Sequence, residues 1–287
     1  MPNSATASPG ASPRLRTASV RNFLMCAPEH FAVTYSGNPF MDPTTPINTA
    51  LALRQWENLR DTYRLLGHSV TLLAPIPGLV DMVFAANGGF TLDGKAYVAR
   101  CAYPQRRAEA PAFQSWFESH GFDTYVPGYV NEGEGDFAVI GDIILAGTGF
   151  RSRPESHSEL AAIFEREVVS LALVDPRFYH LDVALTVLDS ESVSGTCRIA
   201  YFPPAFDAAS QAVLAKRFPD AILVDEDEAA LLALNSVSDG RHVIVSDSAP
   251  RYIRQLLAAG YTPVPVDLSE LLKGGGGIKS CTQELRR

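Results

Sequence analysis

Four polar segments of this 287-residue chain carry side chains that can take part in covalent chemistry. They are DMVFAANGG with Asp81, Phe84 and Asn87, NEGEGD with Glu132, Glu134 and Asp136, FYHLD with His180 and Asp182, and GGGGIKSC, which ends at Cys281. A cysteine, a histidine and acidic residues that lie far apart in a sequence are the pattern of a thiol nucleophile assembled by folding. The sequence therefore suggests a cysteine-dependent enzyme.

Cys281 differs from the other three cysteines in its surroundings. Cys26, Cys101 and Cys197 fall inside apolar segments, where a free cysteine is usually a small buried hydrophobic residue. Cys281 stands among Gly, Lys, Ser and Thr, a setting that suits a thiolate. We expect residues 278–281 to form a short strand that enters the core from a glycine hinge. Removal of residues 281–287 should then abolish turnover and leave folding mostly intact.

His180 and Asp182 open an otherwise apolar segment that we interpret as a strand. Alternation along a strand would place both side chains on one face. An imidazole and a carboxylate on a half-buried face need polar partners. The pair therefore belongs either to a reactive site or to a structural histidine that is satisfied by hydrogen bonds.

The other two segments also have simpler interpretations. DMVFAANGG contains Asn-Gly, a strong turn dipeptide, so the segment can also be interpreted as an ordinary strand-to-turn connection. NEGEGD, taken alone, is typical of a solvated acidic loop. Neither segment specifies a site without the others.

No metal or cofactor is expected. The cysteines include no CxxC pair and no second histidine lies near Cys281, which argues against a metal site. After the first apolar segment the chain reads APEHFAVTYSGNPFMD, which is not a glycine-rich phosphate loop. Nucleotide binding therefore has no support.

Composition indicates a soluble protein of the cytoplasm. Hydrophobic residues make up 46% and charged residues 20% of the chain, and the net charge of −8 disfavours nucleic acid and anionic membranes as partners. No apolar run approaches the roughly 18–20 residues of a membrane span. The scattered cysteines favour a reducing compartment. Residues 1–20, rich in Ser, Ala and Pro, are predicted to be a disordered arm, and residues 21–287 a single catalytic domain.

A strand–helix–strand pattern recurs five times along the chain. The five helix candidates are 47–67, 105–121, 154–168, 207–220 and 251–260, each between two apolar segments. A doubly wound parallel sheet would require the missing phosphate loop. Five similar units around a central axis, an α/β propeller of five blades, fit better, and such a ring would bring polar groups at the strand ends into one central pocket.

The four segments, in this order, resemble those of the guanidine-modifying or amidinotransferase family, whose fold is the five-bladed pentein propeller. The resemblance runs from about Asn22 to the C-terminus. It implies that Cys281 attacks the central carbon of a guanidinium, that His180 protonates the departing amine and then activates water, and that Glu132 holds His180 and the substrate. Because EGEGD departs from the family's EGGD, Glu134 is an alternative to Glu132.

The resemblance also implies a substrate-binding set. Asp182 would pair with the guanidinium through two hydrogen bonds. Arg106 and Arg151 lie where family members bind the substrate carboxylate, and Asp81, Phe84 and Asn87 line the site. The combination of AAN with HLD is most similar to arginine dihydrolases, which convert arginine to ornithine, ammonia and carbon dioxide. Asn87, as a neutral amide, could donate to the ureido oxygen of citrulline and so retain it for a second hydrolysis.

Four alternatives to an arginine dihydrolase remain open from the sequence. A dimethylarginine dimethylaminohydrolase or an arginine deiminase would stop after one hydrolysis at citrulline. An amidinotransferase would need a site for an acceptor amine, which nothing marks. A non-catalytic pentein binding module would lack the reactive groups. The expected partner is a small molecule, arginine or a methylated arginine, together with a homo-oligomeric contact, and residues 36–48 are expected to act as a lid.

Overall fold

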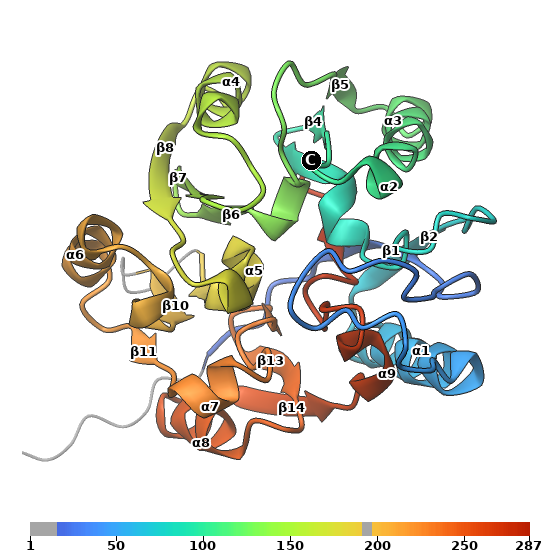
Figure 1. Cartoon of the computed structure of the whole chain (residues 1–287). Coiled ribbons are helices and arrows are strands. Elements are labelled where there is room, and N and C mark those ends of the chain that lie inside the picture. Colours follow the sequence, from blue (N-terminus) through green and yellow to red (C-terminus); the bar gives the residue numbers. More distant parts are fainter. Residues whose placement is uncertain (1–15, 191–196) are drawn as a thin grey trace, which may run out of the picture.

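Five three-stranded sheets surround a common centre in the computed structural model, which describes residues 16–190 and 197–287 (Figure 1). The first sheet contains β1 (Asn22–Cys26), β2 (Ser69–Leu73) and β15 (Gln283–Glu284). The next two contain β3 (Gly89–Leu92), β4 (Lys95–Val98) and β5 (Asp123–Tyr125), and β6 (Phe137–Ile140), β7 (Ile143–Thr148) and β8 (Glu167–Ala172). The last two contain β9 (Leu185–Asp189), β10 (Arg198–Tyr201) and β11 (Ile222–Leu223), and β12 (Val237–Ser238), β13 (His242–Ser246) and β14 (Thr262–Val266).

Each sheet has one parallel and one antiparallel strand pair. The parallel pairs are joined by the longer helices, which lie on the outside of the molecule in Figure 1: α1 (Thr49–Leu65), α3 (Ala110–Ser119), α4 (Pro154–Phe164), α6 (Ala208–Arg217) and α8 (Pro250–Ala258). The five recurring units predicted from the sequence coincide with these five sheets. The predicted α/β class is confirmed.

Local sequence explains where the outer helices begin. The Asn48 side chain accepts a hydrogen bond from the backbone N–H of Leu51 at the start of α1, and Asp207 does the same for Ser210 at the start of α6. Helices α3, α4 and α8 carry proline in their first turn, where no intrahelical donor is lost. The buried faces of these helices then pack on the sheets.

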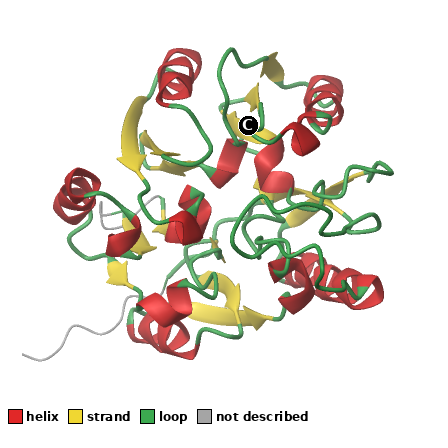
Figure 2. Cartoon of the chain, in the orientation of Figure 1, coloured by secondary structure: helices red, strands yellow, loops and turns green. Residues whose placement is uncertain are grey.

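Short helical segments lie nearer the centre than the long helices (Figure 2). The α-helical ones are α2 (Pro104–Arg107), α5 (Leu181–Ala184), α7 (Glu226–Ala229) and α9 (Ser269–Leu272). The 3-10 turns are η1 (Ala85–Gly88), η2 (Gly133–Gly135), η3 (Pro176–Phe178) and η4 (Pro203–Ala205). Segments η1, η2 and α5 contain or adjoin the polar motifs singled out in the sequence.

Two elements near the predicted site differ from expectation. Asp182 lies in α5 and His180 caps it, so neither belongs to the strand, which begins at Leu185. Residues 278–281 form a turn, and β15 begins two residues after Cys281. The turn closes through a hydrogen bond that the Cys281 backbone N–H donates to Gly277 O, which an extended strand could not make.

The glycine run is closely packed and does not form an open hinge. A Cβ on Gly276 would lie 2.3 Å from the Phe84 ring, and one on Gly274 would lie 2.9 Å from both Phe31 and Phe84. Gly275 has a φ of +85°, which favours glycine. These glycines allow the chain to pass tightly against aromatic rings.

Only residues 16–20 of the predicted N-terminal arm belong to the described part of the chain. Residues 1–15 lie outside the described part of the chain. Arg16 forms an ion pair of 2.6 Å with Asp189 and stacks over the Tyr261 ring, and the Ser19 N–H donates to Asp239 O. Residues 16–20 therefore lie against the domain. No helix among the described residues is long and apolar enough to cross a membrane.

Candidate active site

Six of the predicted site residues line one small cavity of about 20 Å³. These are Asp81, Phe84, Asn87, Arg106, Arg151 and His180. The cavity also touches residues of the expected lid and of the glycine run. Its volume is close to that of a single water molecule, so the site is closed in this conformation.

His180 is fixed between two carboxylates. Its Nδ1 lies 3.1 Å from Asp136 Oδ1 and its Nε2 lies 3.2 Å from Glu132 Oε2. Burial alone would lower the pKa of His180, but Asp136 and Glu132 together raise it to about 9. The imidazole is therefore protonated at neutral pH and can act as a general acid.

Glu132 is fully buried and connects His180 to Arg151. Its Oε1 accepts the backbone N–H of Ala102 at 3.0 Å, and Arg151 Nη1 lies 3.1 Å from its Oε2. Burial alone would raise the pKa of Glu132, but Arg151 and His180 hold that pKa well below its usual range. This residue stays ionised and orients the imidazole.

The alternative residue, Glu134, lies elsewhere. It forms ion pairs with Lys279 and Arg286 on the other side of η2. Of the two glutamates in EGEGD, the structure places Glu132 beside His180.

The two predicted arginines are buried and already hydrogen-bonded. Arg106 pairs with Glu109 at 2.8 Å and its Nη1 donates to Asn87 Oδ1 at 2.8 Å. Because a guanidinium can only donate, the Asn87 oxygen must face Arg106, and the Asn87 amide nitrogen donates to Glu132 O at 3.0 Å. One of the two amide hydrogens of Asn87 is thereby left for a ligand.

Asp182 lies behind Ser280 and does not line the small cavity. Its Oδ2 accepts a hydrogen bond of 3.1 Å from Ser280 Oγ. Its Oδ1 is buried and has no hydrogen-bond partner among the described residues. Burial raises the pKa of Asp182 to about 6, so a cation placed against it would be stabilised strongly.

Cys281 occupies a different place from the one expected. Its side chain has no exposed surface and packs in the apolar cluster that contains Phe23, Met25 and Tyr63. It is absent from the residues lining the small cavity, whereas its neighbour Ser280 is among them. Burial raises the pKa of the Cys281 thiol, and the Asp182 carboxylate raises it further. The surroundings do not favour a thiolate.

The other cysteines are also free thiols. Cys26 at the end of β1 and Cys101 after β4 are buried, as expected, while Cys197 precedes β10 and is partly exposed. Within the described residues, no group of three or more His, Cys, Asp or Glu side chains could hold a metal ion.

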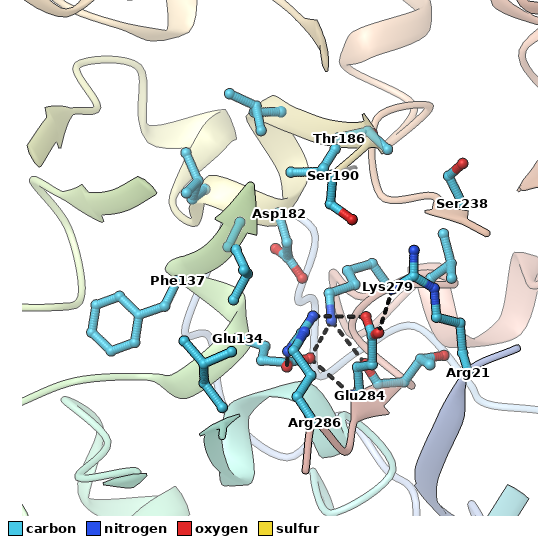
Figure 3. Close-up of a pocket in the computed structure, with 18 of the residues that line it drawn as sticks. Arg21, Glu134, Phe137, Asp182, Thr186, Ser190, Ser238, Lys279, Glu284 and Arg286 are labelled. Atoms are coloured by element: carbon cyan, nitrogen blue, oxygen red, sulfur yellow. Dashed lines mark hydrogen bonds and ion pairs between the residues drawn. The ribbon is translucent and has the colours of Figure 1, made fainter. Parts of the chain in front are cut away.

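A second, larger cavity of about 350 Å³ has Asp182 in its wall (Figure 3). Its charged residues are largely satisfied by one another: Lys279 and Arg286 pair with Glu134, and Arg21 pairs with Glu284 at 3.1 Å. His180, Asn87 and Arg151 do not line it. We therefore place the candidate site in the smaller cavity, where the acid–base groups meet.

Three important residues were absent from the predicted set. Asp136 is the second carboxylate on His180, Asn235 donates to Ser280 Oγ at 3.0 Å, and Ser280 itself faces the cavity. Asp136 was noted among the acidic residues of the NEGEGD segment, but the sequence assigned it no role. Asn235 lies in the segment LNSVS, which carries no comparable signal.

The expected lid covers the cavity. Tyr35, Asn38 and Met41 line it, the Asn38 amide donates to Gly274 O at 3.1 Å, and Arg151 Nη2 donates to Gly37 O at 2.7 Å. Movement of this segment would therefore change the space available to a ligand.

Comparison with known proteins gives relatives of two named activities. The chain is 50% identical over 274 residues to an N(G),N(G)-dimethylarginine dimethylaminohydrolase of Mycobacterium tuberculosis, covering 96% of this chain and 89% of that protein. It is 38% identical over 267 residues to the bifunctional arginine dihydrolase/ornithine cyclodeaminase ArgZ of Synechocystis, covering 90% of this chain but 37% of ArgZ. A search of protein-family models gives no match.

Solved structures agree with these relatives. The N-terminal domain of ArgZ, bound to substrate in a variant with a cysteine replaced by serine, superposes with a TM-score of 0.88 at 36% identity, over 93% of this chain and 98% of that domain. A dimethylarginine dimethylaminohydrolase adduct superposes with a TM-score of 0.74 at 20% identity, which shows a shared fold. The resemblance inferred from the four motifs is confirmed: the chain belongs to the family of arginine-modifying hydrolases that contains dimethylarginine dimethylaminohydrolases and arginine dihydrolases, enzymes that act on guanidino carbon–nitrogen bonds.

Proposed function

We propose that the small cavity binds the guanidinium of arginine and that the protein hydrolyses it in two rounds, to ornithine, ammonia and carbon dioxide. One observation supports this most: an imidazole held between two carboxylates lines a small cavity together with two arginines and a primary amide. Such a cavity provides acid–base chemistry for an amine leaving group and cations for a substrate carboxylate.

In the proposed binding mode the guanidinium extends from the small cavity past Ser280 to the Asp182 carboxylate behind it. Among the described residues its Oδ1 has no hydrogen-bond partner, so this oxygen can accept an N–H of the ligand. The substrate carboxylate would be bound by Arg106 and Arg151, as the family resemblance implies. Asp81 and Phe84 complete the wall of the cavity.

His180 acts twice in each round. It donates its proton to the departing ammonia, and the resulting neutral imidazole then accepts a proton from the attacking water. Glu132 and Asp136 hold both ring nitrogens, so the ring keeps its orientation through both steps. Two adjacent residues, Ser280 and Cys281, could supply the nucleophile.

Asn87 supports the second round. After the first hydrolysis the ligand carries a neutral ureido oxygen, which an amide N–H can bind and a carboxylate would repel. The asparagine of ArgZ is relevant here, because an asparagine-to-serine variant of that domain was trapped with a covalent reaction intermediate. We therefore expect Asn87→Asp to release citrulline before it is cleaved again.

The test is product analysis. Purified protein is incubated separately with arginine, citrulline and dimethylarginine, and ornithine, citrulline, amines and ammonia are quantified. The proposal expects ornithine from arginine in the wild type and mainly citrulline in Asn87→Asp. An unchanged ratio of ornithine to citrulline in Asn87→Asp would exclude the role of Asn87.

Single-round hydrolysis of methylated arginine is the second candidate. The 50% identity with the dimethylarginine dimethylaminohydrolase of M. tuberculosis favours it. In the same experiment, release of dimethylamine from dimethylarginine without ornithine from arginine would support this alternative.

We also infer that residues 21–287 form one catalytic domain closed as a five-bladed propeller. The support is that β1 pairs with β2 on one edge and with the C-terminal β15 on the other, so both ends of the chain contribute to one sheet. The four free cysteines fit a reducing cytoplasm. Homo-oligomer formation stays a prediction.

A further inference from the structure

Two adjacent residues face opposite ways at the C-terminal turn. Ser280 lines the cavity that contains His180, while the side chain of Cys281 points into the apolar cluster behind the turn. We propose that Ser280 Oγ, and not Cys281 Sγ, stands at the position of the attacking nucleophile, and that the chain therefore binds arginine-type guanidines tightly relative to the rate at which it cleaves them. This inference rests on the proposed function of the cavity.

Ser280 is held in place by several hydrogen bonds. Its backbone N–H donates to Asn235 Oδ1 at 3.1 Å, and its carbonyl accepts the N–H of Ala86 at 3.0 Å. Its Oγ accepts from Asn235 Nδ2 at 3.0 Å and donates to Asp182 Oδ2 at 3.1 Å. The hydroxyl is thus oriented beside a carboxylate that can accept its proton.

The side chain of Cys281 packs on the core side of the turn. Its side chain is fully buried, and the next residue anchors the turn on the core side, where Tyr63 Oη and Thr282 Oγ1 are hydrogen-bonded at 2.8 Å. A rotation of the turn that carried the thiol toward the cavity would break the Ser280 bonds to Ala86 and Asn235.

Spacing in the relatives agrees with this assignment. Two ArgZ structures each carry one substitution, the first at a cysteine and the second at an asparagine. The number of residues between those two positions equals the number between Asn87 and Ser280 in this chain. Cys281 is one residue too far along the chain. The cysteine-to-serine variant of that domain holds its substrate, and this chain carries serine naturally at the matching separation.

The chemistry balances with a hydroxyl. Ser280 Oγ forms a bond to the guanidinium carbon and passes its proton to Asp182, and the carbon–nitrogen bond breaks as His180 protonates the leaving ammonia. Water then attacks the Ser280-linked carbon and gives a proton to His180, and Asp182 returns its proton to Ser280 as the carbon–oxygen bond breaks. Arginine and water thus give citrulline and ammonium.

A hydroxyl makes the first step slow. A cysteine near its ordinary pKa is a few per cent thiolate at neutral pH, whereas an alcohol is essentially un-ionised and is a much weaker nucleophile. A thiol at position 280 would therefore raise the rate without changing the binding groups.

The position of the nucleophile is tested first by alkylation. The full-length wild type, Ser280→Cys and the double variant Ser280→Cys/Cys281→Ala are treated with iodoacetamide, and labelled peptides are identified by mass spectrometry. Cys197, which is partly exposed, serves as an internal reference. We expect rapid labelling at position 280 in both variants, suppressed by arginine, and no labelling of Cys281 in the native wild type. Arginine-protected labelling of Cys281 in the wild type would overturn the proposal.

Turnover gives the second readout. We expect Ser280→Cys to raise kcat for arginine on the order of a hundredfold or more, because a thiolate replaces an alcohol. Ser280→Ala should lose residual turnover and keep arginine binding, measured as a ligand-induced rise in melting temperature, and Cys281→Ala should keep the wild-type kcat. Loss of turnover in Cys281→Ala with arginine binding retained would overturn the proposal.

These experiments distinguish a failure of the proposed cavity function from a failure of the Ser280 assignment. Absence of any arginine-induced shift in melting temperature in all variants would refute the proposed function of the cavity. The ligand-free alkylation pattern would still report which of the two side chains faces it, and labelling of Cys281 in preference to the introduced thiol would refute the assignment of Ser280.

Discussion

At the scale of single residues, the site is organised around a charged histidine. His180 forms ion pairs with Asp136 and Glu132, and Glu132 is shared with Arg151. Removing one member of such a buried network leaves an uncompensated charge, which is costly. The geometry therefore fixes the protonation state that an amine leaving group needs.

The histidine makes stability depend on pH in a defined window. Its pKa of about 9 in the folded protein lies above the ordinary 6.5, so its stabilising contribution is complete below pH 6.5 and is lost as pH rises through 9. The difference corresponds to about 3 kcal/mol. Denaturant unfolding at pH 6.5 and 9.5 should show that His180→Gln loses this part of the pH dependence.

His157 provides the matched control for that measurement. It is also buried, but burial lowers its pKa, so its titration affects stability below pH 6.5 and not above. His157→Gln should therefore keep the wild-type difference between pH 6.5 and 9.5. If both variants keep that difference, the charged state assigned to His180 is wrong.

Sequence could predict the types of residue at the site but not the direction each side chain faces. The motifs named His180, Glu132 and Asn87, which the structure brings together around one cavity. The choice between Ser280 and Cys281 depends on a turn that presents consecutive side chains to opposite sides, and local composition does not encode that. Asn235 was missed because its role depends on a tertiary contact.

At the scale of elements, tight turns bring the motifs together. In η2, Gly133 has a φ of +56°, and a Cβ there would lie 2.4 Å from Gly89 O. The turn carries Glu132 on one side and Asp136 on the other. Its close approach to the end of η1 places both carboxylates beside His180.

Gly133→Ala should be far more destabilising than an ordinary glycine substitution. The left-handed backbone costs about 1 kcal/mol, and the clash with Gly89 adds to give at least about 3 kcal/mol. Gly94→Ala is the control, since Gly94 has a φ of +75° with no atom within 4 Å of an added Cβ. Equal losses of unfolding free energy in the two variants would show that the close approach is not important.

The lid should control ligand exchange. Asn38→Ala removes the bond that ties the lid to Gly274, so opening becomes easier and both association and dissociation of arginine should become several-fold faster. Stopped-flow fluorescence measures both rates. Thr44→Ala is the control, because within residues 16–190 and 197–287 the Thr44 side chain hydrogen-bonds with Asp42 alone, on an exposed part of the same region. Identical rates in the two variants would argue against the lid.

At the scale of the whole molecule, the C-terminal segment completes the first sheet. β15 pairs with β1, the Leu285 N–H donates to Asn22 O at 2.7 Å, and Thr282 and Gln283 are fully buried. Sequence periodicity predicted the five units but not this pairing, because β15 is two residues long and gives no periodic signal. The expectation that the last seven residues are dispensable for folding conflicts with these contacts.

Deletion of residues 282–287 should therefore destabilise the whole domain. The deletion removes a buried strand and the Arg286–Glu134 ion pair. Calorimetry of the deletion protein should therefore show no cooperative unfolding transition at moderate temperature. Deletion of Arg287 alone, which is exposed, should leave the transition unchanged. A deletion protein with the wild-type melting temperature would contradict this prediction.

The central claim is that an arginine-type guanidinium binds in the cavity beside His180 and faces Ser280. A crystal structure of the wild type with L-arginine tests it directly. We predict that the guanidinium carbon lies about 3–3.5 Å from Ser280 Oγ, that Asp182 contacts the guanidinium nitrogens, and that Cys281 remains in the core. Arginine bound instead in the larger cavity, or a Cys281 thiol turned toward the guanidinium, would contradict it.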